Sequence, residues 1–115
     1  MNNSRRSYDE LRRRFDRHYL LKSSADHLEW DAQAMMPTGS GDLRGAQLGL
    51  LRALAHAAIT EPDTADLLTA ADAAPPEDEW ERANLAAMRR AWVHAAAVPG
   101  DLVEAHTRAT SRCEL

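Results

Sequence analysis

The sequence predicts an all-α protein of about five helices packed as an antiparallel array. Apolar residues recur at intervals of three and four through most of the chain, which is the spacing of one helix face. No segment of four or more residues alternates between apolar and polar in the way that a half-buried strand does. Proline and glycine divide the chain into helix-length pieces, and the short connections between them favour antiparallel neighbours.

The first predicted helix runs from Ser7 to about Met35. Ser7 could cap it, with Glu10 three residues later completing a capping box. The helix could bend near residues 23–24, and it should end before Pro37, because proline cannot continue a helix. Its apolar residues fall on one face and then on a neighbouring stripe: Leu11, Phe15 and Tyr19, followed by Leu21, Ala25, Leu28 and Ala32.

The second predicted helix begins near Asp42, because an acid there satisfies free backbone amides and suits the helix dipole. It ends near residues 60–62, and a short third helix follows over about residues 63–73, with Leu67 and Leu68 buried. Two prolines after Ala74 end this third helix. The second helix carries an apolar seam, which we expect to face the core: Leu43, Gln47, Leu50, Leu51, Leu54 and Ala58.

A fourth helix is predicted over residues 77–97, and it is interrupted at Val98 because the residue before a proline avoids helical geometry. Asp101 could cap a fifth helix, whose stripe is Leu102, His106, Ala109 and Cys113. Residues 111–115 carry no helix stop signal, so we expect the chain to end in mid-helix, as a truncation would. The stripe of the fourth helix is expected to be Trp80, Asn84, Ala87, Met88, Ala91, Trp92 and Ala95.

Composition bounds the protein to at most one small domain of 115 residues with a thin, alanine-rich core, since aromatic residues are only 5% of the chain. A thin helical core often needs a neighbour to cover it. The net charge of -4 argues against a nucleic-acid binder. The single cysteine excludes an internal disulfide. With no apolar run of membrane-spanning length and no signal peptide, we expect a cytoplasmic protein without a membrane partner.

The titratable residues do not predict a metal site or a catalytic site. His27 and Asp31 are spaced i, i+4, but Glu29 points away from both on a helix, and a catalytic zinc ion needs three protein ligands. His106 and Cys113 are about two turns apart, roughly 10 Å, which is too far for a hydrogen bond. We therefore predict that the chain has no catalytic, cofactor-binding or metal-binding residues of its own.

Basic residues in the first helix are interpreted as a solvated face or a partner contact rather than as a nucleic-acid site. They spread around the helix, and acids between them can pair with them. The arginines are Arg5, Arg6, Arg12, Arg13, Arg14 and Arg17, and the acids are Asp9, Glu10 and Asp16.

The segment around Trp30 and Asp31 is interpreted as structural. Trp30 is expected to be a packing anchor, and the pair Met35–Met36 is expected to lie in the core. Asp31 could hold the backbone amides of the following turn or pair with Arg44. Loss of its carboxylate should therefore lower thermal stability.

One set of residues carries a resemblance to a known family: Trp30, Asp31, Met36, Pro37, Gly39, Arg44, Gln47, His56, Val98, Pro99, Leu102 and Val103. Together they are similar to the N-terminal signature of the carboxypeptidase Taq family of metal-dependent carboxypeptidases. The similarity extends from about Tyr8 to Leu115. The resemblance implies a mostly helical enzyme that releases C-terminal residues from peptides, in which zinc or cobalt activates water and a glutamate acts as general base. The family's metal motif, H-E-x-x-H, does not occur here.

The resemblance implies that residues 1–115 are the N-terminal helical region of a larger, mostly helical peptidase, ending before the catalytic part. We expect this region to form a wall or lid of the substrate cleft, to bind no metal and to be inactive alone. Its expected partners are the missing catalytic part, a peptide substrate in the full-length form and a second copy in a homodimer, but not nucleic acid. The alternative is a stand-alone helical interaction module without enzymatic activity.

Overall fold

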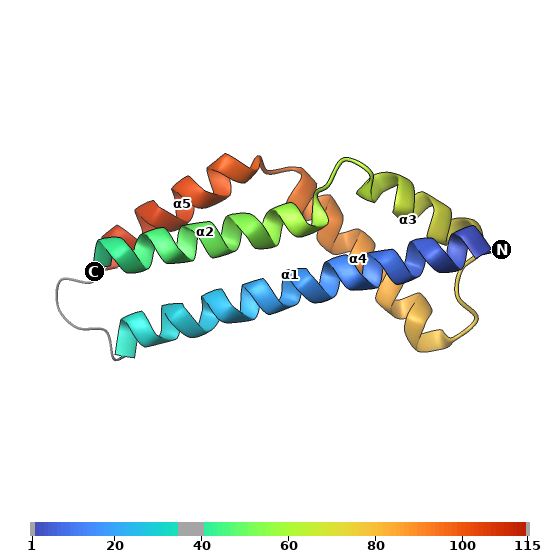
Figure 1. Ribbon diagram of the computed structural model, residues 1–115, viewed down its shortest axis with the longest axis horizontal. Helices are drawn as coiled ribbons and strands as arrows, with labels where there is room; N and C mark the ends of the chain where they lie inside the picture. The colour runs from blue at the N-terminus through green and yellow to red at the C-terminus, as the bar shows by residue number, and fades with distance from the viewer. Residues whose placement is uncertain (1, 35–40, 115) are drawn as a thin grey trace.

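The computed structural model describes residues 2–34 and 41–114, with side chains over residues 3–31 and 41–110, and every element in these ranges is an α-helix (Figure 1). The described ranges contain no strand, which confirms the predicted all-α class. The helices are α1 (Asn2–Ala34), α2 (Gly41–Ile59), α3 (Thr64–Ala73), α4 (Glu79–Ala96) and α5 (Gly100–Glu114). None of these described helices combines the length and apolar character that a membrane span requires.

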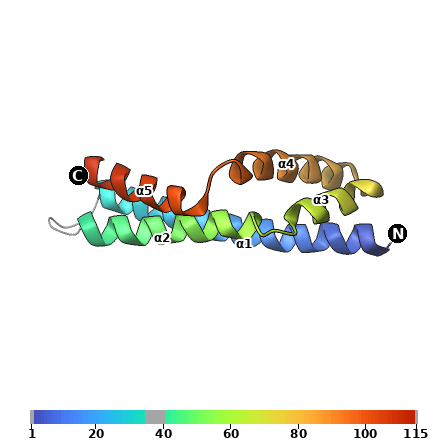
Figure 2. The same ribbon diagram turned by 90° about the horizontal axis from the view of Figure 1, so that it is seen from above.

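The long helix α1 is the spine of the molecule. α2 lies antiparallel to the second half of α1, and α5 packs antiparallel on α2, whereas α3 packs along the first half of α1 (Figure 1). Figure 2 shows α4 and α5 one after the other on the same side of α1 and α2. The result is an elongated body with extents of 55 × 24 × 16 Å. Its two ends are therefore built from different sets of helices.

The main hydrophobic core lies at the N-terminal end of α1, where α3 and α4 cover it. Leu11 and Leu68 at its centre are fully buried. Tyr8 is buried as well, and its hydroxyl accepts a hydrogen bond from the Asn84 amide at 3.2 Å. The cluster consists of Tyr8, Leu11, Leu68, Ala71, Leu85 and Met88, with Phe15, Leu67 and Trp92 packed against it.

The predicted start of the first helix is wrong. Helix α1 already begins at Asn2, so Ser7 lies inside it and is buried rather than serving as a cap. Glu10 does not complete a capping box; its carboxylate accepts hydrogen bonds from Arg13 and Arg14. The helix starts earlier because the first turns are held against the rest of the protein, which a local capping pattern does not report.

The other helix ends agree with the predicted limits to within two residues. Asp78 caps α4, and its carboxylate accepts from the backbone N–H of Glu81 at 3.0 Å. The carboxylate of Asp101, in the first turn of α5, accepts from the N–H of Leu102 at 3.0 Å. Asp101 therefore lies inside α5 instead of capping it as predicted, and Asp78 is a cap that was not predicted.

The predicted apolar seam of α2 does not face the core. Its members Leu43, Leu50 and Leu54 are exposed, and Gln47 is exposed with them. The buried residues of α2 are instead Gly45, Leu48, Gly49, Ala55 and Ile59. The small side chains lie inside because α5 approaches closely. A Cβ atom on Gly49 would lie 3.1 Å from Cγ of Arg108 and 3.3 Å from the backbone oxygen of Glu104.

The predicted apolar stripes of α1 and α4 are partly correct, and the described part of the predicted stripe of α5 is wrong. Tyr19 is 68% exposed and Trp80 is 83% exposed, although Met88 on the predicted stripe of α4 is buried. Asn84, Ala87 and Ala91 are exposed as well, and Leu85, which the stripe omitted, is buried. On α5 the predicted stripe of Leu102, His106 and Ala109 is exposed, while Val103 and Thr107 are half-buried. The side chains of Ala32, Met35, Met36 and Cys113 lie outside the described residues.

Candidate functional site

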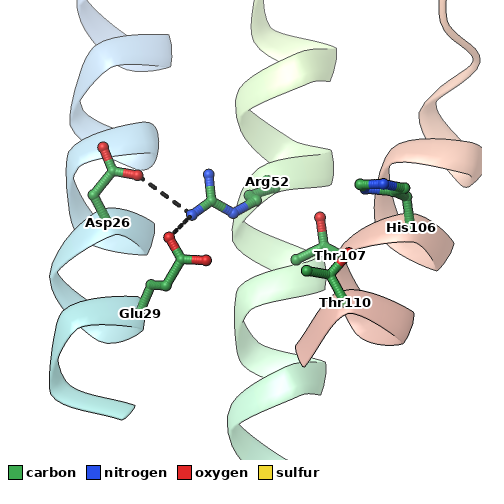
Figure 3. A pocket seen from close by; sticks show the side chains of 6 residues that line it. All are labelled: Asp26, Glu29, Arg52, His106, Thr107 and Thr110. Carbon is green, nitrogen blue, oxygen red and sulfur yellow. Dashed lines mark hydrogen bonds and ion pairs between the residues drawn. The ribbon is translucent and has the colours of Figure 1, made fainter. Parts of the chain in front are cut away.

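Polar side chains from three helices converge on a pocket of about 280 Å³ between α1, α2 and α5 (Figure 3). Each helix brings a different kind of group: α1 brings carboxylates, α2 a guanidinium, and α5 an imidazole and hydroxyls. Figure 3 shows the α1 and α2 groups pointing toward one another, with the α5 groups across from them. The lining residues are Asp26, Glu29, Arg52, His106, Thr107 and Thr110.

One guanidinium serves both carboxylates of this pocket. Nη2 of Arg52 donates to Oδ1 of Asp26 at 3.3 Å and to Oε2 of Glu29 at 3.2 Å. Two carboxylates facing one guanidinium leave the α1 side of the pocket negatively charged. On the other side, the Thr107 hydroxyl donates to the Val103 carbonyl at 2.9 Å, so its oxygen can still accept a hydrogen bond.

This pocket offers charged groups and hydrogen-bonding groups. Its described lining residues include no serine or cysteine, and the hydroxyl hydrogen of Thr107 is directed to a backbone carbonyl rather than to a base. His106 is exposed on α5. The pocket therefore provides charge and hydrogen bonds for a polar ligand or a neighbouring chain.

The described side chains also do not fit a catalytic metal. Such a zinc site needs three protein ligands, and no group of three or more His, Cys, Asp or Glu is placed to hold an ion among the residues with described positions. Asp31 is bonded to Arg44 and Glu29 to Arg52, while His27 is exposed. No step of metal chemistry can be derived for this part of the chain.

The predicted pairing of Asp31 with Arg44 is present and joins α1 to α2. Nη1 of Arg44 lies 2.7 Å from Oδ2 of Asp31 and also donates to the Leu28 carbonyl at 3.2 Å. The Arg44 side chain is mostly buried. This contact is a structural clamp, as the sequence predicted. The alternative partner of Asp31, the turn over residues 35–40, lies outside the described residues.

Histidines connect further helices. Nε2 of His56 lies 2.7 Å from the Ala95 carbonyl oxygen in the last turn of α4, and Nδ1 of His18 lies 2.7 Å from the Ala55 carbonyl oxygen of α2. The His56 imidazole N–H donates to the Ala95 carbonyl, which also accepts from the backbone N–H of Val98 at 3.1 Å. Of the residues that carried the family resemblance, Arg44, Asp31 and His56 therefore join helices, whereas Gln47 and Leu102 are exposed. Trp30 is 65% exposed, so the prediction that it is a packing anchor is wrong.

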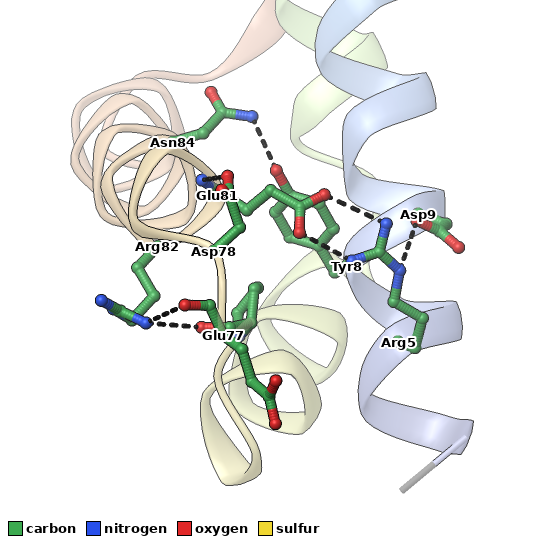
Figure 4. Close-up of polar contacts among 9 residues, drawn as sticks. Arg5, Tyr8, Asp9, Glu77, Asp78, Glu81, Arg82 and Asn84 are labelled. Carbon is green, nitrogen blue, oxygen red and sulfur yellow. Dashed lines mark hydrogen bonds and ion pairs between the residues drawn. The ribbon is translucent and has the colours of Figure 1, made fainter.

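A second polar cluster joins the first turns of α1 to α4 (Figure 4). The Arg5 guanidinium donates to both carboxylate oxygens of Glu81, at 2.8 and 3.0 Å, and it also pairs with Asp9 at 3.3 Å. It lies 5.3 Å from the centroid of the Tyr8 ring. The hydrogen bond from Arg5 lowers the pKa of the Glu81 carboxyl below its ordinary value, and it raises the pKa of Arg5.

A third clamp attaches the start of α3 to α1. Arg14 donates to Oδ1 of Asp63 at 2.7 Å and to Oδ2 at 3.0 Å, and its Nε also donates to Glu10. The Arg14 hydrogen bond lowers the pKa of Asp63. Arg5, Arg13 and Arg14 thus pair with acids of the same chain. No sequence pattern indicated the pairs with Glu81 and Asp63, because the partners are 76 and 49 residues apart.

Comparison with known proteins adds family information to this geometry. The sequence model of the carboxypeptidase Taq (M32) metallopeptidase family matches residues 10–115. The match includes most of α1 and all of α2, α3, α4 and α5. No curated protein and no solved structure matches the chain.

Proposed function

Because the chain belongs to the carboxypeptidase Taq (M32) metallopeptidase family, we propose that it provides the N-terminal helical part of an enzyme that removes C-terminal residues from peptides. In this proposal it forms a wall or lid of the substrate cleft and leaves the chemistry to another part of the enzyme. The family match over residues 10–115 carries the proposal. A cytoplasmic location accords with the single cysteine.

The shape of the molecule supports a role as a wall. The body is only 16 Å along its shortest axis, which leaves apolar side chains such as Tyr19, Trp30 and Trp80 exposed. The polar pocket between α1, α2 and α5 adds hydrogen-bonding groups on which a peptide chain could lie. A thin helical layer with a polar pocket on its surface is suited to lining a cleft and not to enclosing a reaction centre.

The metal chemistry belongs outside the described residues. When bound, a zinc or cobalt ion would polarise the scissile carbonyl and activate water for attack. The side chains described here do not form a ligand set of three or more His, Cys, Asp or Glu. We therefore assign to this chain the positioning of the peptide and the exclusion of water from one side of the cleft.

The test is carboxypeptidase turnover of a blocked dipeptide with added zinc or cobalt. It is measured on the 115-residue chain and on a longer form of the protein that includes a metal motif. We expect turnover by the longer form only. Turnover by the 115-residue chain would contradict the proposal that the chemistry lies in another part of the enzyme. Turnover by neither form would favour a stand-alone helical module.

The role of the pocket can be tested separately in the longer form. Replacing Asp26 by Asn together with Glu29 by Gln removes the negative charge and keeps similar shapes. If the pocket lines the substrate path, KM for peptides should change severalfold while kcat stays the same. The matched control is Asp16→Asn, an exposed charge on the same helix. Equal KM values for both variants would remove the pocket from the substrate path.

A further inference from the structure

The polar pocket between α1, α2 and α5 contains an arginine of which only one nitrogen is bonded. Nη2 of Arg52 donates to Asp26 at 3.3 Å and to Glu29 at 3.2 Å, and Figure 3 shows both contacts ending on this one nitrogen. Nε and Nη1 of Arg52 make no hydrogen bond to another described residue. The guanidinium therefore keeps donors for a ligand, and it has no acceptor of its own.

Two other arginines that join α1 to its neighbours are used more completely. All three guanidinium nitrogens of Arg5 contact carboxylates, and so do all three of Arg14. Arg44 resembles Arg52 in using a single nitrogen, but it does not line this pocket. Arg52 thus combines unused donors with a position in the wall of a cavity.

The opposite kind of group is available on α1. One oxygen of Glu29, Oε1, makes no hydrogen bond to another described residue, and Figure 3 shows it pointing toward the α5 side of the pocket. The Asp26 carboxylate is more occupied, because Nζ of Lys22 lies 3.9 Å from its Oδ2. Ionised carboxylates only accept hydrogen bonds, so this wall suits an ammonium group.

The charges in and beside the pocket balance one another. Asp26 and Glu29 bring two negative charges, Arg52 brings one positive charge, and Lys22 beside the pocket brings a second. Such a site has no general attraction for a cation or for an anion. It does offer unused groups of both signs close together, so it complements a ligand that carries one charge of each sign.

Helix α5 completes the pocket with further hydrogen-bonding groups. The His106 ring and the Thr110 hydroxyl make no hydrogen bond to another described residue, and both line the pocket. The volume of about 280 Å³ lies just below the range of common small-molecule sites, which is roughly 300–1,000 Å³. The pocket therefore suits a small polar molecule better than a large one.

We propose that this pocket binds a free α-amino acid. Its ammonium group lies against Glu29 and Asp26, and its carboxylate pairs with the unused nitrogens of Arg52, with His106 and Thr110 as further donors. An α-amino acid carries both charged groups on one carbon atom, which matches acids and a guanidinium that already touch. That this ligand is the residue released from a peptide rests on the proposed function, whereas the binding itself does not.

The test is a titration of the isotope-labelled 115-residue chain with L-alanine, followed by two-dimensional NMR of the backbone amides. We expect shifts around residues 26, 29, 52 and 106–110 and none in α3. N-acetyl-L-alanine lacks the ammonium group and L-alaninamide lacks the carboxylate, so each should bind about tenfold more weakly or worse. If either analogue bound as tightly as L-alanine, the pocket would recognise a single charge, and the proposal would be overturned.

Two variants test the residues. Arg52→Gln removes the guanidinium and should weaken L-alanine binding about tenfold or more. Because Arg52 also joins α2 to α1, Glu29→Gln is the second variant, which keeps the arginine and removes one carboxylate charge. It should weaken binding severalfold. The matched control is Asp16→Asn, an exposed charge on the same helix, and equal affinities of this control and Glu29→Gln would refute the site.

The outcome is separable from that of the turnover experiment. If L-alanine produced no shifts up to its solubility limit, or shifts only outside the pocket, the site would be overturned even if the longer form hydrolysed peptides. Binding at the pocket without turnover by the longer form would support the site and would overturn only the identification of its ligand as a reaction product.

Discussion

At the scale of single residues, arginine side chains hold α1 to the other helices. Arg5 reaches α4, Arg14 reaches α3, and Arg44 and Arg52 reach back from α2 to carboxylates on α1. The planar guanidinium suits this work, because it can donate several hydrogen bonds in a fixed geometry. Arg14 and Arg44 are the most buried of these four, so their partners should matter most.

Asp31→Ala should therefore lower the melting temperature. The change leaves the mostly buried Arg44 guanidinium without its carboxylate. We expect a loss of about 1 kcal/mol, which corresponds to about 4–8 °C for a domain of this size. The measurement is thermal unfolding followed by circular dichroism, with Asp16→Ala as the control on the same helix. Unchanged melting of Asp31→Ala would show that the clamp contributes nothing.

Acid should destabilise the protein partly through the clamp between Arg14 and Asp63. The pKa of Asp63 is lowered in the folded state from its ordinary value of 3.8, because Arg14 bonds to the carboxylate. The folded protein then binds this proton less readily than the unfolded chain. The contribution to stability is present above pH 3.8 and is lost as the pH falls through the lower folded value.

Asp63→Asn should thus lower the free energy of unfolding at neutral pH. Below pH 3.8, this free energy should decrease less steeply with falling pH than it does in the unaltered protein. Urea unfolding at a series of pH values measures both effects. Asp16→Asn serves as the control, and its acid limb should match that of the unaltered protein. If the free energy of unfolding of Asp63→Asn fell with pH as steeply as that of the unaltered protein, the proposed effect of the Asp63 pKa would be contradicted.

At the scale of helices, most limits could be predicted from the sequence, except for the start of α1, but the buried faces could not in every case. Prolines such as Pro62 and Pro99 act through local geometry, so they limit helices without reference to the rest of the chain. The buried face of α2 depends on the approach of α5, which is a tertiary event. The spacing of the leucines predicted as buried a stripe that is exposed. Gly45 and Gly49 lie inside, but a glycine adds nothing to a pattern of apolar side chains.

The candidate pocket was missed for the same reason. Asp26 and Glu29 lie three residues apart on one helix, but nothing in that spacing pointed to a pocket. Their partner Arg52 and the opposing His106 come from other helices. No spacing within a helix predicts that these four side chains meet, because their proximity follows from how α2 and α5 pack.

Gly49→Leu should separate α5 from α2. Even a Cβ atom at this position would lie 3.2 Å from Cγ of Glu104, so a longer side chain must displace the helix. We expect destabilisation of about 1–3 kcal/mol by overpacking. The matched control is Ala105→Leu, which adds the same side chain on the exposed face of α5. Equal unfolding midpoints in urea for the two variants would refute close packing at Gly49.

At the scale of the whole molecule, stability should be distributed unevenly along the long axis. The main hydrophobic cluster joins the N-terminal half of α1 to α3 and α4. By contrast, none of the α5 residues with described side chains, 100–110, is buried. The radius of gyration is 16.7 Å, against about 13 Å for a compact domain of this length. A body this extended cannot share one core between its two ends.

Native-state hydrogen exchange should therefore differ between the ends. Amides of α5 are expected to exchange through local opening at low free energy, whereas those of α3 should approach the global unfolding limit. Mass spectrometry of peptic fragments measures both.

Leu68→Val removes one methylene from the fully buried centre of the core and should lower the free energy of unfolding by about 1 kcal/mol. It should speed exchange in α3 and leave α5 unchanged, because α5 opens without the core. Equal acceleration in both helices would mean that the molecule unfolds as one cooperative unit despite its shape.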